Sequence, residues 1–371
     1  MSSRQPTLIA SVASLRRLIA HVSELDRLGV DTEFHAERRY RPELMLVQLA
    51  DDEGNAWIVD PRSVDIRPLA EAMSGRTWVV FAADTDLELL AALGGRPSTL
   101  HDPQRLAGLA GHAWPRSLAD LCAAELGLEV DKAPALSDWS RRPLSESQRA
   151  YAADDALLAL RLWDALAARV APERVAWAVE DGDELIEAAG RPVDPDQRWL
   201  RMRIAPRLDR QARSALHRLA AWREAAAREA GQPPWSLLPD AHMLDLARRR
   251  PADLDAIRAH RRMHRGSIRK HGQTWLTLIH AAPDAETPPA PPTDREVRAA
   301  LLTLAAHAIG RARQVSPHLL FTDRWTDRVL AEGPSALTGW RATVAREPLS
   351  ALLSGSLAMT NTDWTPDFVT V

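Results

Sequence analysis

Strand-like and helix-like patterns alternate through the first part of the chain and then give way to helical patterns alone. Apolar runs of β character recur between residues 7 and 82, and helical periods separate several of them. After residue 170 we find no convincing strand pattern. This order predicts an α/β domain, with a mixed sheet and helices packed around it, followed by small all-α domains. A length of 371 residues also favours more than one domain.

The expected elements follow from the spacing of apolar residues and from turn-forming clusters. We expect strands at 7–10, 29–34, 44–50, 55–60 and 78–82, and helices over 15–22, from 86 or 87 onward, and over 145–169, 208–229 and 240–249. The cluster Asp51-Asp52-Glu53-Gly54-Asn55 is typical of a turn and predicts an antiparallel hairpin between the strands on either side.

Composition divides the chain further. We expect an α/β domain over residues 1–170, a connecting helical segment over 171–207, a helical domain over 208–282, a proline-rich linker over 283–293, and a second helical domain with its tail over 294–371. Four prolines at 288, 289, 291 and 292 predict an extended, semi-rigid linker.

The overall totals exclude several classes of protein. A formal net charge of -3 is not the footprint of a chain that is basic throughout. The single cysteine, Cys122, rules out a disulfide framework and a thiolate metal site, and its apolar surroundings predict a buried thiol. The first residues lack the pattern of a signal peptide, and no apolar run is long enough to span a membrane. We therefore expect a cytoplasmic, monomeric protein with no membrane partner.

Acidic residues occur where strands and helices of the first domain end. Asp31 and Glu33 are two apart on a strand, so both side chains emerge on one face. Asp86 follows a buried strand, and Tyr151 and Asp155 share a helix face. Carboxylates suit hard divalent cations such as Mg²⁺ or Mn²⁺. Each feature has a plainer interpretation: Asp-x-Glu is common on strands, Asp86 could complement a helix dipole, and Tyr151 and Asp155 could be a surface pair.

Taken together and in order, these features resemble a known family. The stretches Val30–Phe34, Val79–Glu88 and Tyr151–Asp155 resemble the three motifs of the DEDD exonuclease superfamily in its tyrosine-bearing form. Asp131-Lys132 and Ser137–Ser145 are similar to a stretch characteristic of the ribonuclease D family. The likeness runs through most of the first 165 residues.

Two positions depart from the family pattern. Phe81 stands where histidine is common, so a polar contact near Asp86 is expected to be missing. Asp154 stands where an apolar residue is usual. The Tyr-x-x-x-Asp spacing assigns Asp155 as the metal ligand, and neither departure removes a carboxylate.

The resemblance implies an RNase H-like exonuclease domain and a metal-dependent 3′→5′ exoribonuclease. Asp31, Glu33 and Asp155 would hold one Mg²⁺ or Mn²⁺, with Asp31 also bridging to a second cation that Asp86 would bind through water. Tyr151 would orient the attacking hydroxide. Nucleoside 5′-monophosphates would leave one at a time from RNA 3′ ends, and tRNA precursors are the family's usual substrate.

Two alternative functions stay open from the residues alone. A DNA 3′→5′ exonuclease would use the same acids, since these also serve DNA proofreading domains. A catalytically weak scaffold that binds nucleic acid would be expected to have lost a carboxylate, and none is lost.

The helical half resembles a second kind of module. Residues 208–281 are similar to an HRDC domain, chiefly at Ala220–Glu224 and Leu244–Pro251, and residues 294–357 resemble a second, more divergent copy with Leu337–Arg341 as its best marker. Between Arg248 and His271 there are nine Arg or Lys residues, three histidines and two acids. This cluster predicts a phosphate-binding face, although a solvated helix surface is the plainer alternative. The residues that we expect to contact nucleic acid are Arg261, Arg262, Arg265, Arg269 and Lys270.

Overall fold

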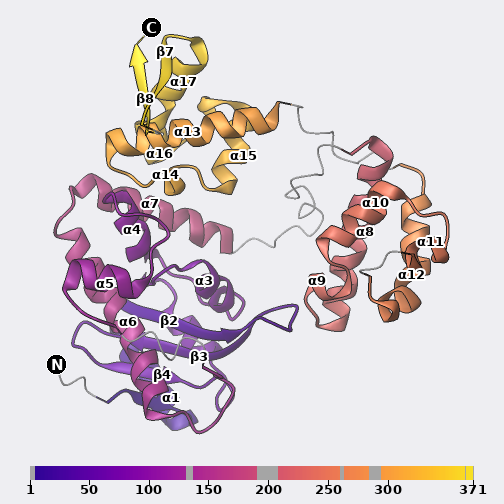
Figure 1. The fold of residues 1–371 in the computed structure, drawn as a ribbon. Helices are drawn as coiled ribbons and strands as arrows, with labels where there is room; N and C mark the ends of the chain where they lie inside the picture. Colours follow the sequence, from indigo (N-terminus) through magenta and orange to yellow (C-terminus); the bar gives the residue numbers. More distant parts are fainter. Residues whose placement is uncertain are drawn as a thin grey trace. The chain divides into compact units, whose positions relative to one another are not determined.

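The computed structural model describes residues 5–130, 137–189, 208–259, 263–283, 294–363 and 365–370. The chain forms two compact units. The first unit comprises Met1–Phe34, Leu44–Arg191 and Val297–Val371, and the second comprises His35–Glu43 and Pro192–Glu296. Figure 1 shows the elements of both.

A six-stranded sheet lies at the centre of the first unit, in the order β1-β4-β3-β2-β5-β6. Its strands are β1 Thr7–Ile9, β2 Arg27–His35, β3 Glu43–Ala50, β4 Ala56–Val59, β5 Thr77–Val79 and β6 Thr99–His101. β3 and β4 pair antiparallel across the turn that the sequence predicts, whereas β1 with β4, β2 with β5, and β5 with β6 pair parallel. The predicted mixed sheet is thus confirmed, and β6 is a strand that the sequence pattern did not reveal.

Helices cover both faces of this sheet. One hydrophobic cluster joins the sheet to α1 Val12–Ser23, α2 Arg67–Met73 and α3 Asp84–Ala91. Another joins it to α4 Pro103–Leu109, α5 Leu118–Leu126 and α6 Glu146–Ala167, with Cys122 buried nearby as expected. The next helix, α7 Pro172–Ala189, packs against β6 and α4 and adds Ala178 to the second cluster and Ile186 to the first. α7 is therefore part of the core of the first unit.

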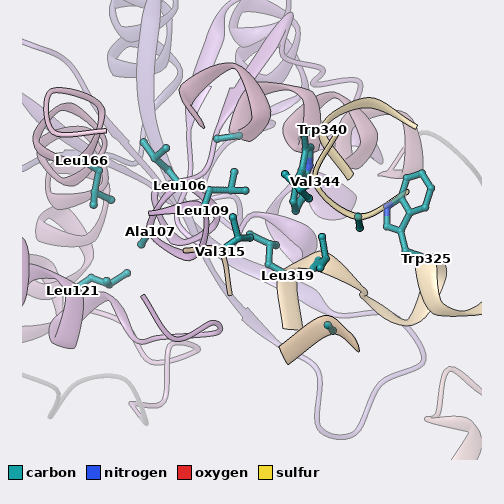
Figure 2. Packing of buried hydrophobic residues seen from close by; sticks show 14 of the residues in the cluster. Leu106, Ala107, Leu109, Leu121, Leu166, Val315, Leu319, Trp325, Trp340 and Val344 are labelled. Carbon is teal, nitrogen blue, oxygen red and sulfur yellow. The ribbon is translucent and has the colours of Figure 1, made fainter. Parts of the chain in front are cut away.

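The C-terminal helices share their core with the sheet-containing part of the first unit. They are α13 Arg295–Arg313, α14 Pro317–Leu320, α15 Asp323–Glu332, α16 Gly339–Arg341 and α17 Glu347–Ser354, with a 3₁₀ helix at Pro334–Ala336 and a π-helix at Ala342–Arg346. Leu319 and Trp340 belong to the same buried cluster as Leu106 of α4 (Figure 2). Apolar burial is the main favourable term in folding, so these helices and α4 stabilise each other.

The second unit has a separate core. Its helices are α8 Arg210–Ala230, α9 Pro234–Leu237, α10 Asp240–Arg249, α11 Leu254–Arg258 and α12 Arg265–His280. Asp209 caps the start of α8, and Gly231 ends it in the left-handed conformation that glycine favours. Leu216, Met243 and Trp275 are buried together in its core.

The C-terminal end corrects the expectation that only helices follow residue 170. β7 Leu357–Thr362 and β8 Thr365–Thr370 form an antiparallel hairpin. Threonine recurs there, and Phe368 and Val369 are also of residue types that are enriched in strands. The run is too short for this pattern to stand out in the sequence. The predicted linker, apart from residue 283, and the segment 190–207 lie outside the described residues. In the described part of the chain, no helix is both long and apolar enough to cross a membrane.

Candidate active site

Strand β2 carries the first two carboxylates of the site. Leu28 and Val30 are fully buried in the cluster beneath α1 and α3. Because side chains alternate along a strand, Asp31 and Glu33 emerge on the opposite face, the one toward α6. The strand therefore fixes both carboxylates through the core packing of their neighbours.

Gly29 lets α6 approach that face closely. A Cβ atom at this position would collide with the backbone carbonyl oxygen of Ala156. The start of α6 is fixed as well, because Ser145 accepts from the amide of Gln148, and the Gln148 side chain accepts from the amide of Ser145. The position of Asp155 along α6, relative to Asp31 and Glu33 on β2, is therefore fixed. Sequence reasoning missed Gly29, and its place two residues before Asp31 was the available signal.

Asp31, Glu33 and Asp155 form a three-carboxylate cluster. Each offers an oxygen, and these atoms all lie within 4.8 Å of one another. All three side chains are half-buried. Like charges at this spacing repel strongly unless a cation or protons lie between them. The cluster brings together three of the four carboxylates that the sequence selected.

Asp86 lies in the first turn of α3, and only 7% of it is exposed. The hydroxyl of Thr32 donates a hydrogen bond to Asp86 Oδ1 at 2.5 Å. Asp86 is not one of the three clustered acids, yet its charge raises the pKa of Asp31 and of Glu33. Asp86 therefore lies near enough to interact with the charges of the cluster. This agrees with its predicted role as the ligand of a second metal ion.

The pKa values of these four acids are all raised, because the carboxylates are buried close to one another. Burial raises the pKa of Asp31 well above its usual range, and the charges of Asp86, Asp155 and Glu33 add to the rise. Burial and the charge of Asp155 raise the pKa of Glu33 to about 8. Burial also raises the pKa of Asp86 and of Asp155 to about 6 each. A divalent cation would relieve this repulsion, so the donor set fits a hard metal ion.

Tyr151 lies one helical turn before Asp155. A hydrogen bond between the two side chains lowers the pKa of Asp155, partly opposing burial, while burial raises the pKa of the Tyr151 phenol. The phenol therefore keeps its proton at neutral pH and can donate it in a hydrogen bond. Its ring packs at 6.1 Å from the buried ring of Trp139, which holds it in place.

The two departures from the family pattern have different consequences. Phe81 packs against the buried cluster of α4 and α6, as an apolar side chain should. Asp86 does have a polar contact, with the hydroxyl of Thr32, which sequence reasoning missed although Thr32 lies between Asp31 and Glu33. Asp154 is half-buried and is not one of the clustered acids.

The predicted nucleic-acid contacts lie in the second unit, where the structure describes some of them. Arg265, Arg269 and Lys270 are exposed on α12, whose opposite side buries Ile268 and Trp275. Arg261 and Arg262, like Asp131 and Lys132 of the family stretch, lie outside the described residues.

Known protein families match both the α/β region and the first helical region of the chain. A family model for a 3′-5′ exonuclease matches residues 6–171, and a model for the HRDC domain matches residues 212–279. Ribonuclease D of Gluconacetobacter diazotrophicus is 34% identical over 95% of this chain and 94% of its own. Ribonuclease D of Pseudomonas paraeruginosa is 32% identical over 85% of this chain and 88% of its own.

A solved structure shows the same fold. The crystal structure of Escherichia coli RNase D, described as an exoribonuclease involved in structured RNA processing, superposes with a TM-score of 0.82 at 25% identity. The match covers 95% of this chain and 99% of that one. The resemblance of the sequence motifs to this family and to the HRDC domain is confirmed, and the chain belongs to the ribonuclease D family.

Proposed function

We propose that this chain is a 3′→5′ exoribonuclease that depends on divalent cations and releases nucleoside 5′-monophosphates from RNA 3′ ends. The observation that carries the proposal is the meeting of Asp31, Glu33 and Asp155 within 4.8 Å, with Asp86 close enough to raise the pKa of Asp31 and Glu33. Membership of the ribonuclease D family supports the reaction and the RNA substrate.

The carboxylates would hold two Mg²⁺ or Mn²⁺ ions. Asp31, Glu33 and Asp155 would bind one, and Asp31 and Asp86 would bind the other. When bound, such a pair of ions stabilises the charge that develops on the attacking and leaving oxygens of a phosphoryl displacement. Oxygen-only donors favour these hard cations over thiophilic metals.

The side chains of the site would then position the reactants. Tyr151 keeps its phenolic proton and lies beside Asp155, so it would orient the attacking water by a hydrogen bond. Thr32 would hold Asp86 in one rotamer through its hydroxyl. Asp31 and Glu33 are fixed by a strand whose neighbouring side chains are fully buried, which keeps the donor atoms in register.

Structured RNA with a free 3′ end, such as a tRNA precursor, is the substrate that we propose. The basic stretch of the HRDC domain would bind its phosphates through Arg265, Arg269 and Lys270, which are exposed, and through Arg261 and Arg262. Each phosphate contact releases a counterion and so strengthens binding most at low salt.

The wider organisation is also a proposal. We infer an exonuclease domain over residues 1–170, followed by a connecting segment over 171–207. An HRDC domain over 208–282 is joined by a linker over 283–293 to a second, divergent HRDC-like domain over 294–371. We further propose that the protein acts as a monomer in the cytoplasm.

Matched RNA and DNA oligomers labelled at either end test the function. With Mg²⁺ or Mn²⁺, RNA should shorten from its 3′ end and yield 5′-mononucleotides, and EDTA should stop the reaction. Preferential digestion of DNA would assign a DNA exonuclease instead. Binding of RNA without digestion, in the presence of either metal, would leave a scaffold and overturn the proposal.

A further inference from the structure

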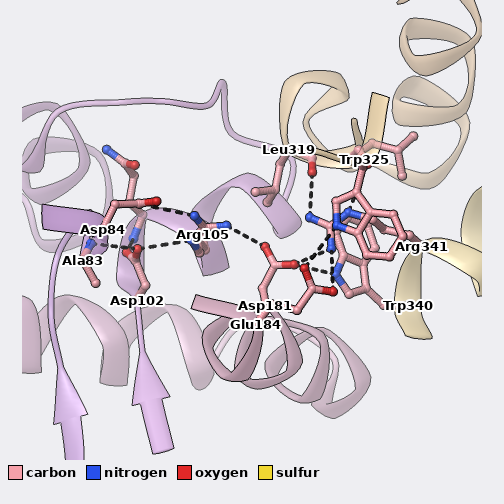
Figure 3. A network of polar contacts seen from close by, with 12 residues as sticks. Ala83, Asp84, Asp102, Arg105, Asp181, Glu184, Leu319, Trp325, Trp340 and Arg341 are labelled. Atoms are coloured by element: carbon pink, nitrogen blue, oxygen red, sulfur yellow. Dashed lines mark hydrogen bonds and ion pairs between the residues drawn. The ribbon is translucent and has the colours of Figure 1, made fainter. Parts of the chain in front are cut away.

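Arg341 of α16 is a charged residue in the middle of the C-terminal helices, and only 1% of it is exposed. Its Nη1 lies 2.6 Å from Oδ1 of Asp181 on α7 (Figure 3). The guanidinium lies over the rings of Trp325 and Trp340, 5.1 and 4.4 Å from their centres. A charge buried this deeply is costly unless it is fully paired, so its contacts define one geometry.

The remaining donors of Arg341 are also used. Its Nε and Nη2 donate to the backbone carbonyl oxygens of Leu320 and Leu319, each at 3.1 Å. Every arm of the guanidinium is therefore fixed either to α7 or to the C-terminal helices themselves.

Asp181 also contacts α4, through Arg105. Its Oδ2 accepts from Nη1 of Arg105 at 2.9 Å, and its Oδ1 accepts from the indole nitrogen of Trp340 at 3.0 Å as well as from Arg341. Asp181 is 1% exposed and Arg105 is 6% exposed. The aspartate thus joins two buried arginines, one from each part of the first unit.

Arg105 in turn reaches the segment that carries Asp86. Its Nη2 lies 3.4 Å from Asp84 Oδ2, and its Nε lies 3.5 Å from Asp102 Oδ2. Asp102 is fully buried and accepts from the backbone amides of Ala82 at 3.1 Å and Ala83 at 3.3 Å.

The segment between β5 and α3 needs such support. Ala82 has φ of +56°, in the left-handed region that side chains other than glycine seldom adopt. A residue is held there only when its surroundings over-determine the conformation. The amide contacts with Asp102 do so, and α3 begins two residues later, with Asp86 in its first turn.

We propose that Arg341, Asp181, Arg105 and Asp102 form a positioning chain through which the C-terminal helices hold Asp86 in place for metal binding. The inference rests on the proposed function of Asp86 as a metal ligand. The four residues touch neither the substrate nor the metal in this scheme; they act through the backbone of residues 82–86.

Apolar packing alone would not explain this arrangement. The C-terminal helices already share a hydrophobic core with α4 and α6. A buried ionic network adds little net stability over apolar residues of similar volume. Its directional contacts can instead fix how the segments that it joins are aligned. The network ends at the backbone amides of Ala82 and Ala83. It therefore fixes the backbone just before Asp86, the proposed metal ligand.

Mn²⁺ binding to the full chain without RNA tests the proposal, measured from the free-Mn²⁺ signal in electron paramagnetic resonance. Arg341→Met and Arg105→Met should weaken Mn²⁺ binding by about 10- to 100-fold, the usual cost of losing a residue that supports a metal ligand. Hydrogen exchange of the amides of residues 82–87 should quicken in both variants. Val344→Ala is the control, because Val344 is buried in the same cluster and is apolar.

The outcomes separate positioning from simple stability. The proposal would be overturned if Arg341→Met and Arg105→Met kept an Mn²⁺ affinity within twofold of the wild type. It would also be overturned if Val344→Ala lost as much affinity at a matched fall in melting temperature. Should Arg341→Met fail to fold, Trp340→Phe removes one hydrogen bond to Asp181 and should show the same shift at smaller size. A wild-type protein that binds no Mn²⁺ would sink the proposed function as well, whereas binding with unaltered variants would sink only the positioning chain.

Discussion

The two helical regions of this protein have similar sequence patterns but different packing. Helices α8–α12 bury their apolar residues against one another, around Leu216 and Trp275. Helices α13–α17 instead complete a cluster that contains residues of α4 and α6. The family model for the HRDC domain matches residues 212–279 of the first region. The likeness of residues 294–357 to a second HRDC domain stays a prediction from sequence. A shared helical pattern therefore does not determine whether a region forms its own core or completes another.

One group of basic residues in each region carries a proposal of its own. The second unit exposes Arg265, Arg269 and Lys270 on α12. The C-terminal helices bury Arg341 against Asp181 of α7. Exposed cations are available to a phosphate backbone, whereas a buried, paired cation can only hold protein segments together. We therefore propose that the exposed cations of α12 bind RNA and that Arg341 supports the active site.

The largest effect should come from truncating one buried tryptophan in each region. Trp340→Ala and Trp275→Ala should each cost about 3–5 kcal/mol, because both rings are almost fully buried. Trp340→Ala should lower the melting transition of the sheet-containing first unit, whereas Trp275→Ala should lower that of the second unit alone. Scanning calorimetry with hydrogen exchange in β2 and α8 would assign the transitions. If the melting transition of the first unit were unchanged in Trp340→Ala, the C-terminal helices would not share the core of that unit. The contrast with α8–α12 would then be wrong.

A smaller effect is expected from neutralising the exposed cations of α12. The triple variant Arg265→Gln, Arg269→Gln, Lys270→Gln should raise KM for RNA without changing kcat, since these residues lie away from the carboxylates in sequence and are proposed to bind backbone phosphates. The slope of log affinity against log salt concentration should become shallower by roughly one for each phosphate-binding side chain that is neutralised. Fluorescence anisotropy across a salt series measures this slope.

Two exposed arginines of the first unit provide a control for that variant. Arg16 and Arg17 are exposed on α1 of the first unit. Their replacement by glutamine should leave the salt slope unchanged. Equal losses in both variants would mean that the α12 cluster is an ordinary solvated surface.

The smallest effect concerns the pH dependence of the first unit. Burial lowers the pKa of His101 from 6.5 to about 4, and its ring stacks on Trp163 at 4.0 Å. Between these values the unfolded chain binds more protons than the folded one, so the contribution of His101 to the unfolding free energy falls as the pH falls from 6.5 toward 4. The advantage of wild type over His101→Gln in urea unfolding should shrink across that window. A constant difference would contradict it.

Much of the first unit follows from its sequence because local patterns and core packing agree there. The turn at residues 51–55 specifies the β3–β4 hairpin, and the alternation around Asp31 and Glu33 places both carboxylates on one face. The helix that carries Tyr151 and Asp155 was bounded to within a residue or two, because Ser145 is a strong cap.

The missed features depend on contacts between distant parts of the chain. β6 is three residues long and has no periodicity to read, but β5 pairs with it in the sheet. Gly29 and Thr32 matter through Ala156 and Asp86, which lie far along the sequence. The joining of Arg341 to Asp181 and Arg105 likewise needs three-dimensional proximity that no single pattern encodes.

The most direct test compares two neighbouring acids on α6, Asp154 and Asp155. Asp155→Asn keeps the size of the side chain but removes a clustered charge, whereas Asp154→Asn changes an acid outside the cluster. Release of 5′-mononucleotides from RNA in Mg²⁺ should fall to the level seen with EDTA in Asp155→Asn, with RNA binding and melting temperature retained, while Asp154→Asn stays active. A fully active Asp155→Asn would contradict the assignment of the catalytic site.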